Sequence, residues 1–279
     1  MRDETTLEDY TPRPGSSAHY IVAFIPEERR EAILALYALH RAVDAACEGA
    51  DPGVARLKLR WWGEELGRFS DGNARHPITR TLARHAGPGF PKLDRWLALR
   101  EQELSLPGWE NSEHYFTTVT EAMRQSLEAW SQLLGNPPGA ARHEAADRLG
   151  QGLHLCSALR RCHRMARRGH ATLPIDWLTA AGTGLSDLAL TEATPAVRAL
   201  LVESTDRAVE LLGQAANLWP AAQRAGQLSM LMAAELRRKA LTLQRNEGYR
   251  RLDQLLTPTP LRKLWRAWRT QRRYRHKTA

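Results

Sequence analysis

One segment, residues 27–48, limits the possible folds more than any other part of the sequence. It follows Pro26, has helical periodicity, and carries apolar side chains such as Ile33, Leu36 and Leu39 around nearly its whole circumference. A helix with so little polar surface is normally buried among other elements. Elsewhere Ala, Leu, Arg and Glu also recur at helical spacing, and alternating β-branched runs are almost absent. The sequence therefore predicts an all-α protein.

Glycine and proline clusters divide the chain into helical segments with short joints, most clearly at residues 87–89 and 136–139. We expect one helical domain over residues 17–259, an irregular segment at 1–16, and a basic amphipathic helix at 260–279. The helices are predicted near residues 17–24, 27–48, 53–69, 77–85, 91–104, 111–134, 140–168, 195–217, 220–245 and 260–275.

The net charge of +9 comes almost entirely from one end of the sequence. Residues 261–279 hold eight of the 40 Lys and Arg and no acid, which leaves 32 basic against 31 acidic residues elsewhere. Residues 261–275 place leucines and tryptophans at helical spacing among these cations, a pattern typical of a helix on an anionic membrane surface. In the alternative, the tryptophans pack on the body and the arginines stay in water. Nucleic-acid binding is not predicted, because no further basic stripe or known motif supports it.

The location of the protein is predicted from its cysteines and its hydropathy. The three cysteines lie in helical contexts without a CxxC pair, as reduced thiols of a cytoplasmic protein would. The first residues are acidic and polar, unlike a secretory signal, and no run is apolar enough to span a bilayer. We expect a cytoplasmic protein with a peripheral contact at the inner face of the membrane.

The apolar segment carries four chemically active side chains on one face. Tyr37, Arg41, Asp44 and Glu48 are separated by four, three and four residues, which places them in one row along a helix. An Arg and an Asp three residues apart are commonly a surface ion pair of little energetic consequence. Within an apolar helix, however, polar groups need partners or a function. Such a row suits a hydrated divalent cation and the diphosphate that it carries.

The order of these motifs resembles the squalene/phytoene synthase family. The segment from Tyr37 to Glu48 carries the resemblance, with residues 26–32 before it and residues 57–66 and 76–80 after it. The resemblance implies an all-α isoprenoid-synthase fold around a central cavity. It also implies two aspartate-rich helices that bind Mg²⁺, which grips the diphosphates of two prenyl donors and promotes ionisation.

The resemblance assigns roles to individual residues of this chain. It implies that Ser17, Tyr37 and Arg41 contact diphosphate, and that Asp44 and Glu48 bind the metal. Glu48 stands where the family has an aspartate, and keeps the charge on a longer side chain.

The second aspartate-rich motif of the family is not preserved. The matching frame runs from Ser157 to Pro174, but Arg161 and Met165 occupy the two metal-binding aspartate positions. A guanidinium and a thioether cannot bind Mg²⁺, which prefers oxygen ligands in near-octahedral geometry.

The arginines of this segment have two interpretations. They form a solvated basic face, or Arg160, Arg161 and Arg164 face the cavity and bind an anion directly. In the second case Arg161 lies opposite Asp44 and Glu48, where a salt bridge would close the site.

Two functional hypotheses follow. In the first, the protein binds a prenyl diphosphate or isoprenoid lipid in the former active-site cavity, with catalysis impaired or lost and no cofactor, and acts through that ligand or a protein partner. In the second, it is an active head-to-head prenyltransferase that uses Mg²⁺ at an atypical site. The first agrees better with the residues, because function depends on the site rather than on the fold.

Overall fold

The computed structural model describes residues 7–48, 51–105 and 108–275, which fold into helices without a β-strand. The predicted all-α class is confirmed. The elements in chain order are η1 (Leu7–Tyr10), α1 (Ser17–Ala23), α2 (Glu27–Cys47), α3 (Pro52–Ser70), α4 (Pro77–His85), α5 (Asp94–Ser105), α6 (Ser112–Leu133), α7 (Glu144–Ala166), α8 (Ile175–Ala180), α9 (Leu185–Leu188), α10 (Pro195–Leu218), η2 (Ala221–Gln223), α11 (Leu228–Asn246) and α12 (Pro260–Arg275).

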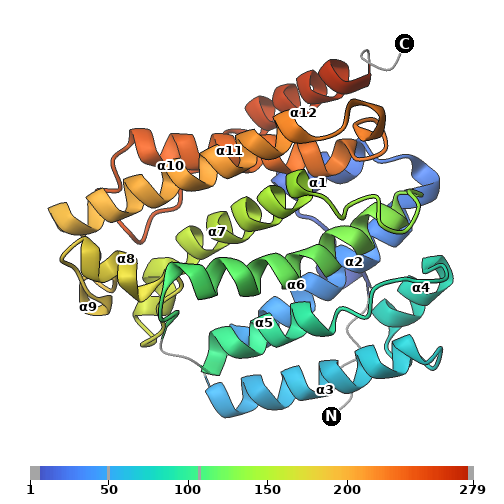
Figure 1. Ribbon diagram of the computed structural model, residues 1–279, viewed down its shortest axis with the longest axis horizontal. Coiled ribbons are helices and arrows are strands. Elements are labelled where there is room, and N and C mark those ends of the chain that lie inside the picture. The colour runs from blue at the N-terminus through green and yellow to red at the C-terminus, as the bar shows by residue number, and fades with distance from the viewer. Residues whose placement is uncertain (1–6, 49–50, 106–107, 276–279) are drawn as a thin grey trace.

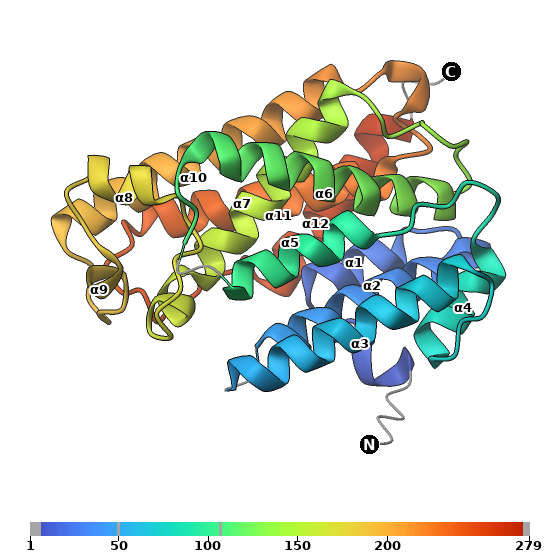
Figure 2. The same cartoon turned by 60° about the horizontal axis from the view of Figure 1, so that its bottom comes forward.

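The helices form a bundle with α2, α6 and α7 at its centre (Figure 1). Helices α3 and α4 lie on one side of these three, and α10, α11 and α12 lie on the other. A view turned by 60° keeps α3 and α10 on opposite sides (Figure 2). Helix α7 packs most extensively against α10 and then against α6, while α2 contacts α3, α4 and α6. This arrangement brings α5 and α7 next to the row formed by Tyr37, Arg41, Asp44 and Glu48, which we call the polar row of α2.

The predicted helices match the observed ones except around two loops. The segment expected at 220–245 is divided into η2 and α11, because the backbone at Gly226 approaches Asn136, whose side-chain amide donates to the Gly226 carbonyl at 3.0 Å. Helices α8 and α9 were not predicted, since they are short and flank the 182–184 glycine break. The irregular segment contains η1; residues 1–6 and 276–279 lie outside the described part of the chain.

Helix α2 is buried along most of its length, as its apolar circumference predicts. Its polar row runs along the remaining strip of surface, which faces α5 and the end of α7. The buried residues of α2 are Ala32, Ile33, Ala35, Leu36, Ala38, Leu39, Ala42, Val43 and Ala46.

The three cysteines are free thiols, as the sequence indicates.

One buried carboxylate joins α3 to α4. Glu65 is fully buried and accepts hydrogen bonds from the backbone N–H groups of Arg75 (2.7 Å) and His76 (2.8 Å) and from the Thr79 hydroxyl (2.5 Å). Burial alone would raise the pKa of Glu65, but these hydrogen bonds and Arg68 together hold it below its ordinary value. Glu65, which lies within the 57–66 segment that carries the resemblance, therefore has a structural role and fixes the start of α4.

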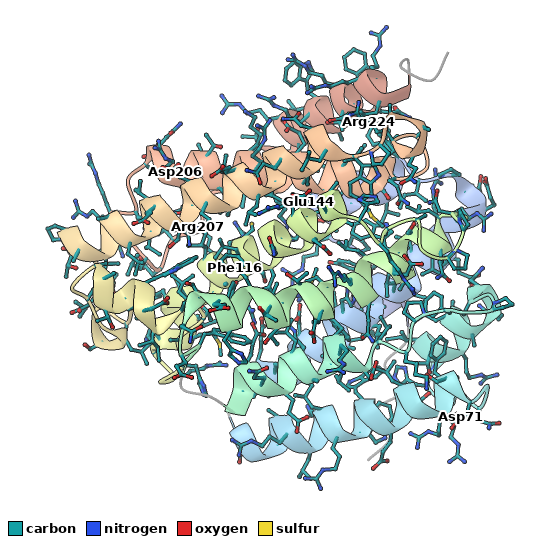
Figure 3. All side chains as sticks on the ribbon, viewed as in Figure 1. Asp71, Phe116, Glu144, Asp206, Arg207 and Arg224 are labelled. Atoms are coloured by element: carbon teal, nitrogen blue, oxygen red, sulfur yellow. The ribbon has the colours of Figure 1, made fainter. Side chains whose placement is uncertain are left out.

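Helix α8 is attached to the bundle by an aromatic ring. Trp177 contacts Phe116 of α6, with ring centroids 6.0 Å apart, and the Arg207 guanidinium of α10 lies 4.6 Å from its ring centroid. Phe116 and Arg207 lie near each other at this end of the bundle (Figure 3). Cation–π and aromatic contacts thus hold a short helix that would not be stable alone.

Candidate functional site

The polar row of α2 lies where this helix meets α5 and α7. Tyr37 is half-buried, and the Arg41 side chain remains 47% exposed, with its guanidinium 3.8 Å from the Asp44 carboxylate. Glu48 follows the last residue of α2, and its backbone N–H donates to the Asp44 carbonyl at 2.9 Å. The helical spacing therefore places the four groups in one row, as the sequence indicates.

Asp44 is paired with a buried arginine from α5. The Arg100 guanidinium donates to Asp44 and, through its other terminal nitrogen, to Glu103 at 2.5 Å. The Arg100 side chain is only 8% exposed. Burial would raise the pKa of Asp44, but the adjacent Arg100 outweighs that effect and holds the pKa below its ordinary value. Asp44 is thus an ionised carboxylate that a guanidinium already neutralises.

Glu103 extends this ion pair to α7. Its Oε1 accepts from the Arg161 guanidinium at 3.0 Å and lies 3.2 Å from Nε2 of His154, whose Nδ1 is 2.9 Å from the Tyr115 hydroxyl. Burial opposes ionisation of Glu103, but Arg161 and Arg100 lower its pKa well below the ordinary value. Two carboxylates and two guanidinium groups therefore alternate across the contact between α2, α5 and α7.

The end of α2 is tied directly to α7. The Glu48 carboxylate accepts from Arg164 at 2.6 Å, and the Glu48 carbonyl accepts from Arg168 at 2.9 Å. Arg161 was expected opposite Asp44 and Glu48; its guanidinium pairs with Glu103 instead, and Arg164 pairs with Glu48. This differs from the expectation because α5 supplies a carboxylate between α2 and α7 that the α2 and α7 sequences alone do not reveal.

A second group of cations lies on the other side of α7. Arg160 faces α11 and α12, where burial lowers its pKa and Arg237 lowers it further. Burial also lowers the pKa of Lys263, and both guanidinium groups add to this effect. The Lys263 ammonium donates to the Gly15 carbonyl at 3.1 Å, next to the start of α1 at Ser17. Three helices thus bring like charges together, and we call Arg160, Arg237 and Lys263 the cationic cluster.

The predicted residues therefore fall into two groups rather than one. Arg161 and Arg164 face the carboxylates of α5 and α2, whereas Arg160 belongs to the cationic cluster near the start of α1. Neighbouring positions on a helix point about 100° apart, which separates Arg160 from Arg161.

Comparisons with known proteins agree with this architecture. A family model described as squalene/phytoene synthase matches residues 11–269. The chain belongs to the squalene/phytoene synthase family. A dehydrosqualene synthase in complex with ligand is structurally similar, with a TM-score of 0.81 and 17% identity over 95% of this chain and 93% of that one. Squalene synthase HpnC from Alicyclobacillus acidocaldarius has a TM-score of 0.66 and 21% identity over 83% and 89%. No curated protein sequence matches the chain significantly.

The squalene/phytoene synthase family acts on prenyl diphosphates and generally uses a divalent metal. The residues of this chain do not fit a shared metal site between α2 and α7. Asp44 and Glu48 are each paired with arginine, and the facing positions are Arg161 and a Met165 side chain that is buried in the core. Within the described residues, no three His, Cys, Asp or Glu side chains meet in a way that could hold a metal ion.

Two cavities help to locate the space available to a ligand. A crevice lined by Arg160, Gln244 and Tyr249 has a volume of about 10 Å³, roughly enough for one water molecule. A larger hollow of about 370 Å³ is lined by Pro91, Arg124, Gln125, Glu128 and Arg142, none of which is a predicted site residue. The helices beside Arg160 would need to separate before a prenyl chain could enter this crevice.

Sequence reasoning missed the residues that neutralise the site from other helices. Arg100 and Glu103 stand three residues apart in α5, a spacing that also describes ordinary surface pairs. The one distinguishing signal is that Arg100 directly follows an apolar run, Trp96 to Leu99. Arg237 and Lys263 carried no signal, because only the packing of α11 and α12 brings them to Arg160.

Proposed function

We propose that the protein binds a prenyl diphosphate or a related isoprenoid lipid in the former active-site cavity, with the diphosphate held by the cationic cluster around Arg160 rather than by Asp44 and Glu48, and with the ionisation chemistry of the family impaired or lost. The observation that carries this proposal is that Asp44 and Glu48 are each paired with an arginine, Arg100 and Arg164. Productive ionisation in this family needs carboxylates on both walls to hold the metal, whereas here the opposing wall supplies guanidinium groups.

The cationic cluster supports recognition of the diphosphate without a metal. Guanidinium and ammonium groups form strong, charge-assisted hydrogen bonds to phosphate oxygens. The like charges of Arg160, Arg237 and Lys263 repel one another, which an anion between them would relieve. Ser17 begins α1 beside this cluster and remains a predicted diphosphate contact. The protein is expected to meet its lipid ligand as a cytoplasmic, peripheral membrane protein, alone or with a protein partner.

Binding and catalysis are measured separately on the same purified protein. Isothermal titration with farnesyl diphosphate, in EDTA and in Mg²⁺, is expected to give similar affinities. Incubation with farnesyl or geranylgeranyl diphosphate and Mg²⁺ is expected to yield no condensed C30 or C40 product. Condensed product, or binding that appears only with Mg²⁺, would instead support an active head-to-head prenyltransferase with an atypical magnesium site, the function that the family relationship favours.

A variant pair tests whether the cationic cluster is the binding site. Arg237→Met removes one guanidinium from the cluster, and we expect it to weaken farnesyl diphosphate binding by roughly tenfold or more. Arg245→Met serves as the matched control, because Arg245 is on the same helix but pairs with Asp206 on the surface. Equal affinities of the two variants would show that the diphosphate binds elsewhere.

A further inference from the structure

Helix α12 presents its aromatic and aliphatic side chains to solvent. Leu261 is 79% exposed, Trp265 48% and Trp268 44%, and Leu264 is also exposed. The positions follow a spacing of three, one and three residues, so they form a single stripe along the helix. We call these four residues the outer face of α12. Two half-exposed tryptophans side by side are unusual on a water-facing helix.

The opposite side of α12 holds it to the bundle. Lys263, Ala267, Thr270 and Tyr274 are buried, at spacings of four, three and four residues, and Ala267 packs in a cluster with Met232 and Leu236 of α11. The prediction that the tryptophans pack on the body is therefore wrong. The helix is anchored through small and polar side chains, and its largest apolar groups remain available to a partner.

The charged groups in contact with the indole rings of the outer face are arginines, of which Arg266 also pairs with Glu235 of α11 at 3.4 Å. The guanidinium groups of Arg266 and Arg269 lie 5.1 and 5.3 Å from the centroid of the Trp265 ring, and that of Arg272 lies 4.9 Å from the Trp268 ring. Residues 261–279 contain no Asp or Glu. Indole rings flanked by arginine are well suited to the boundary between lipid headgroups and acyl chains.

We propose that the outer face of α12 is a docking surface for an anionic lipid bilayer. The tryptophans and leucines would enter the headgroup boundary, and the surrounding arginines would pair with lipid phosphates. None of the described helices is long and apolar enough to cross a membrane, so the contact is with the membrane surface. The charge of this face matches an anionic surface and opposes a second copy of itself.

A comparison with α3 shows why the whole stripe matters. Helix α3 also exposes Val54, Leu57 and Trp61, but Glu64 stands beside them and its carboxylate lies 3.8 Å from Arg68. The apolar stripe of α3 thus has a carboxylate on its own helix beside it, whereas α12 contributes only cations to the border of its stripe; a carboxylate of α11, Glu235, pairs with Arg266 at 3.4 Å and leaves Arg269 and Arg272. Helix α3 lies on the other side of the bundle (Figure 1), which makes it a suitable control surface.

Docking through α12 would place the cationic cluster close to the lipid. Lys263 lies on the buried side of the same helix and faces Arg160 and Gly15. A helix with its side chains is about 10 Å thick, so only that distance would separate the bilayer from the cluster. The membrane contact itself does not depend on prenyl diphosphate binding, and each can be present without the other.

Vesicle sedimentation tests this proposal with the full-length chain and no prenyl diphosphate. We expect the protein to pellet with phosphatidylcholine vesicles that contain a quarter phosphatidylglycerol, and much less with phosphatidylcholine alone. Trp265→Ser with Trp268→Ser is expected to lower the partition coefficient roughly tenfold or more. Arg269→Gln with Arg272→Gln is expected to lower it by a similar factor on the anionic vesicles only.

The control is Trp61→Ser on α3, which changes a similarly exposed indole and should leave pelleting unchanged. Equal pelleting of the wild type and the Trp265/Trp268 variant would overturn the proposal, as would an equal loss in the Trp61 variant. Light scattering tests the alternative that a second copy of the chain binds to the outer face of α12. A dimeric wild type together with a monomeric Trp265/Trp268 variant would assign the face to self-association and contradict the membrane proposal. Farnesyl diphosphate titration of the same variant should be unchanged, which keeps this result distinct from that of the proposed function.

Discussion

Arg100 is the residue on which the site depends most. It is almost fully buried and contacts both Asp44 and Glu103, so its charge offsets two carboxylates that would otherwise repel each other. Burial of ionised groups is costly, and it is tolerated only when opposite charges are in direct contact. The Asp44 carboxylate is thus already paired with a cation of the protein, which any other cation bound there would have to displace.

Removal of this cation should be strongly destabilising. We expect Arg100→Met to lower the free energy of unfolding by about 3 kcal/mol, because Asp44 loses its main partner. Urea denaturation at neutral pH measures the effect. Arg95→Met is the control on the same helix; Arg95 is 67% exposed and 3.9 Å from Glu121, so a change below about 1 kcal/mol is expected. A small effect of both substitutions would show that Arg100 is not needed to balance the carboxylates.

His40 makes the stability of the protein sensitive to acid. Burial lowers its pKa from 6.5 to about 4, and the nearby Arg100 adds to this effect against the opposing influence of Asp44. Between about pH 6.5 and pH 4, His40 is protonated in the unfolded chain but neutral in the folded protein. The free energy of unfolding therefore has its full value, as far as His40 is concerned, above pH 6.5. It decreases as the pH falls towards 4, with a slope approaching ~1.4 kcal/mol per pH unit.

The corresponding measurement is the free energy of unfolding between pH 7 and pH 4. We expect a flatter dependence in His40→Gln, whose neutral amide retains a polar group near the Ser126 hydroxyl, 3.2 Å from His40 Nε2. His19→Gln is the control, because His19 is exposed on α1. The lowered pKa values of Asp44 and Glu103 also make the folded protein less stable as the pH falls, but at lower pH than His40 does. The His40→Gln variant should therefore keep some acid sensitivity. Identical pH profiles for wild type and His40→Gln would contradict the assignment.

At this scale the sequence predicted one half of the site. Tyr37, Arg41, Asp44 and Glu48 share a face because helical spacing alone decides that. The partners of these residues depend on which helices pack together and on how those helices are shifted along their axes, and neither can be predicted from a local sequence pattern. Arg100 illustrates the limit: its spacing to Glu103 looks like a surface pair, yet tertiary packing buries it.

Helix α7 sets the geometry of the bundle through two glycines. A Cβ added at Gly152 would lie 2.8 Å from the Leu212 side chain and 3.2 Å from its backbone nitrogen, and one at Gly150 would lie 2.7 Å from Met123 Cβ. The small residues thus let α10 and α6 approach α7 closely from two sides.

Gly152→Ala should therefore destabilise the bundle, although alanine favours a helix. We expect a loss of about 1–3 kcal/mol, because the added methyl group must displace the backbone of α10. Gly213→Ala on α10 is the matched control: a Cβ there meets nothing within 4 Å, and a gain of about 0.5–1 kcal/mol is expected from reduced backbone entropy. Thermal unfolding of the two variants measures both. Similar shifts of the same sign would show that α7 and α10 are not in tight contact.

Element positions were largely predictable, since long amphipathic helices bounded by glycine and proline carry strong signals. Helices α8 and α9 were missed for a physical reason. They have six and four residues, too few for a periodic pattern, and α8 is held by contacts of Trp177 with Phe116 and Arg207 from distant helices. Tertiary contacts, not local propensity, stabilise elements of this length.

For the whole molecule, α12 is both a cover for the core and an exposed surface. Its buried side shields Met232 and Leu236, so deletion of residues 260–279 should uncover apolar core. We expect that truncation to lower the melting temperature by several degrees or to cause aggregation. The Trp265/Trp268 serine variant, which changes only exposed side chains, should melt within a degree or two of the wild type. A truncated chain as stable as the wild type would show that α12 is not part of the fold.

The hydrogen bond from Lys263 to the Gly15 carbonyl joins positions 248 residues apart. During synthesis Gly15 leaves the ribosome long before Lys263, its hydrogen-bond partner, has been added to the chain. Arg160 and Arg237 can therefore pack within a partly folded bundle, but the third cation arrives only when residue 263 has been made. Under the proposed function, affinity for a diphosphate should therefore appear late in biogenesis, and nascent chains that end before residue 263 should form helices without binding it.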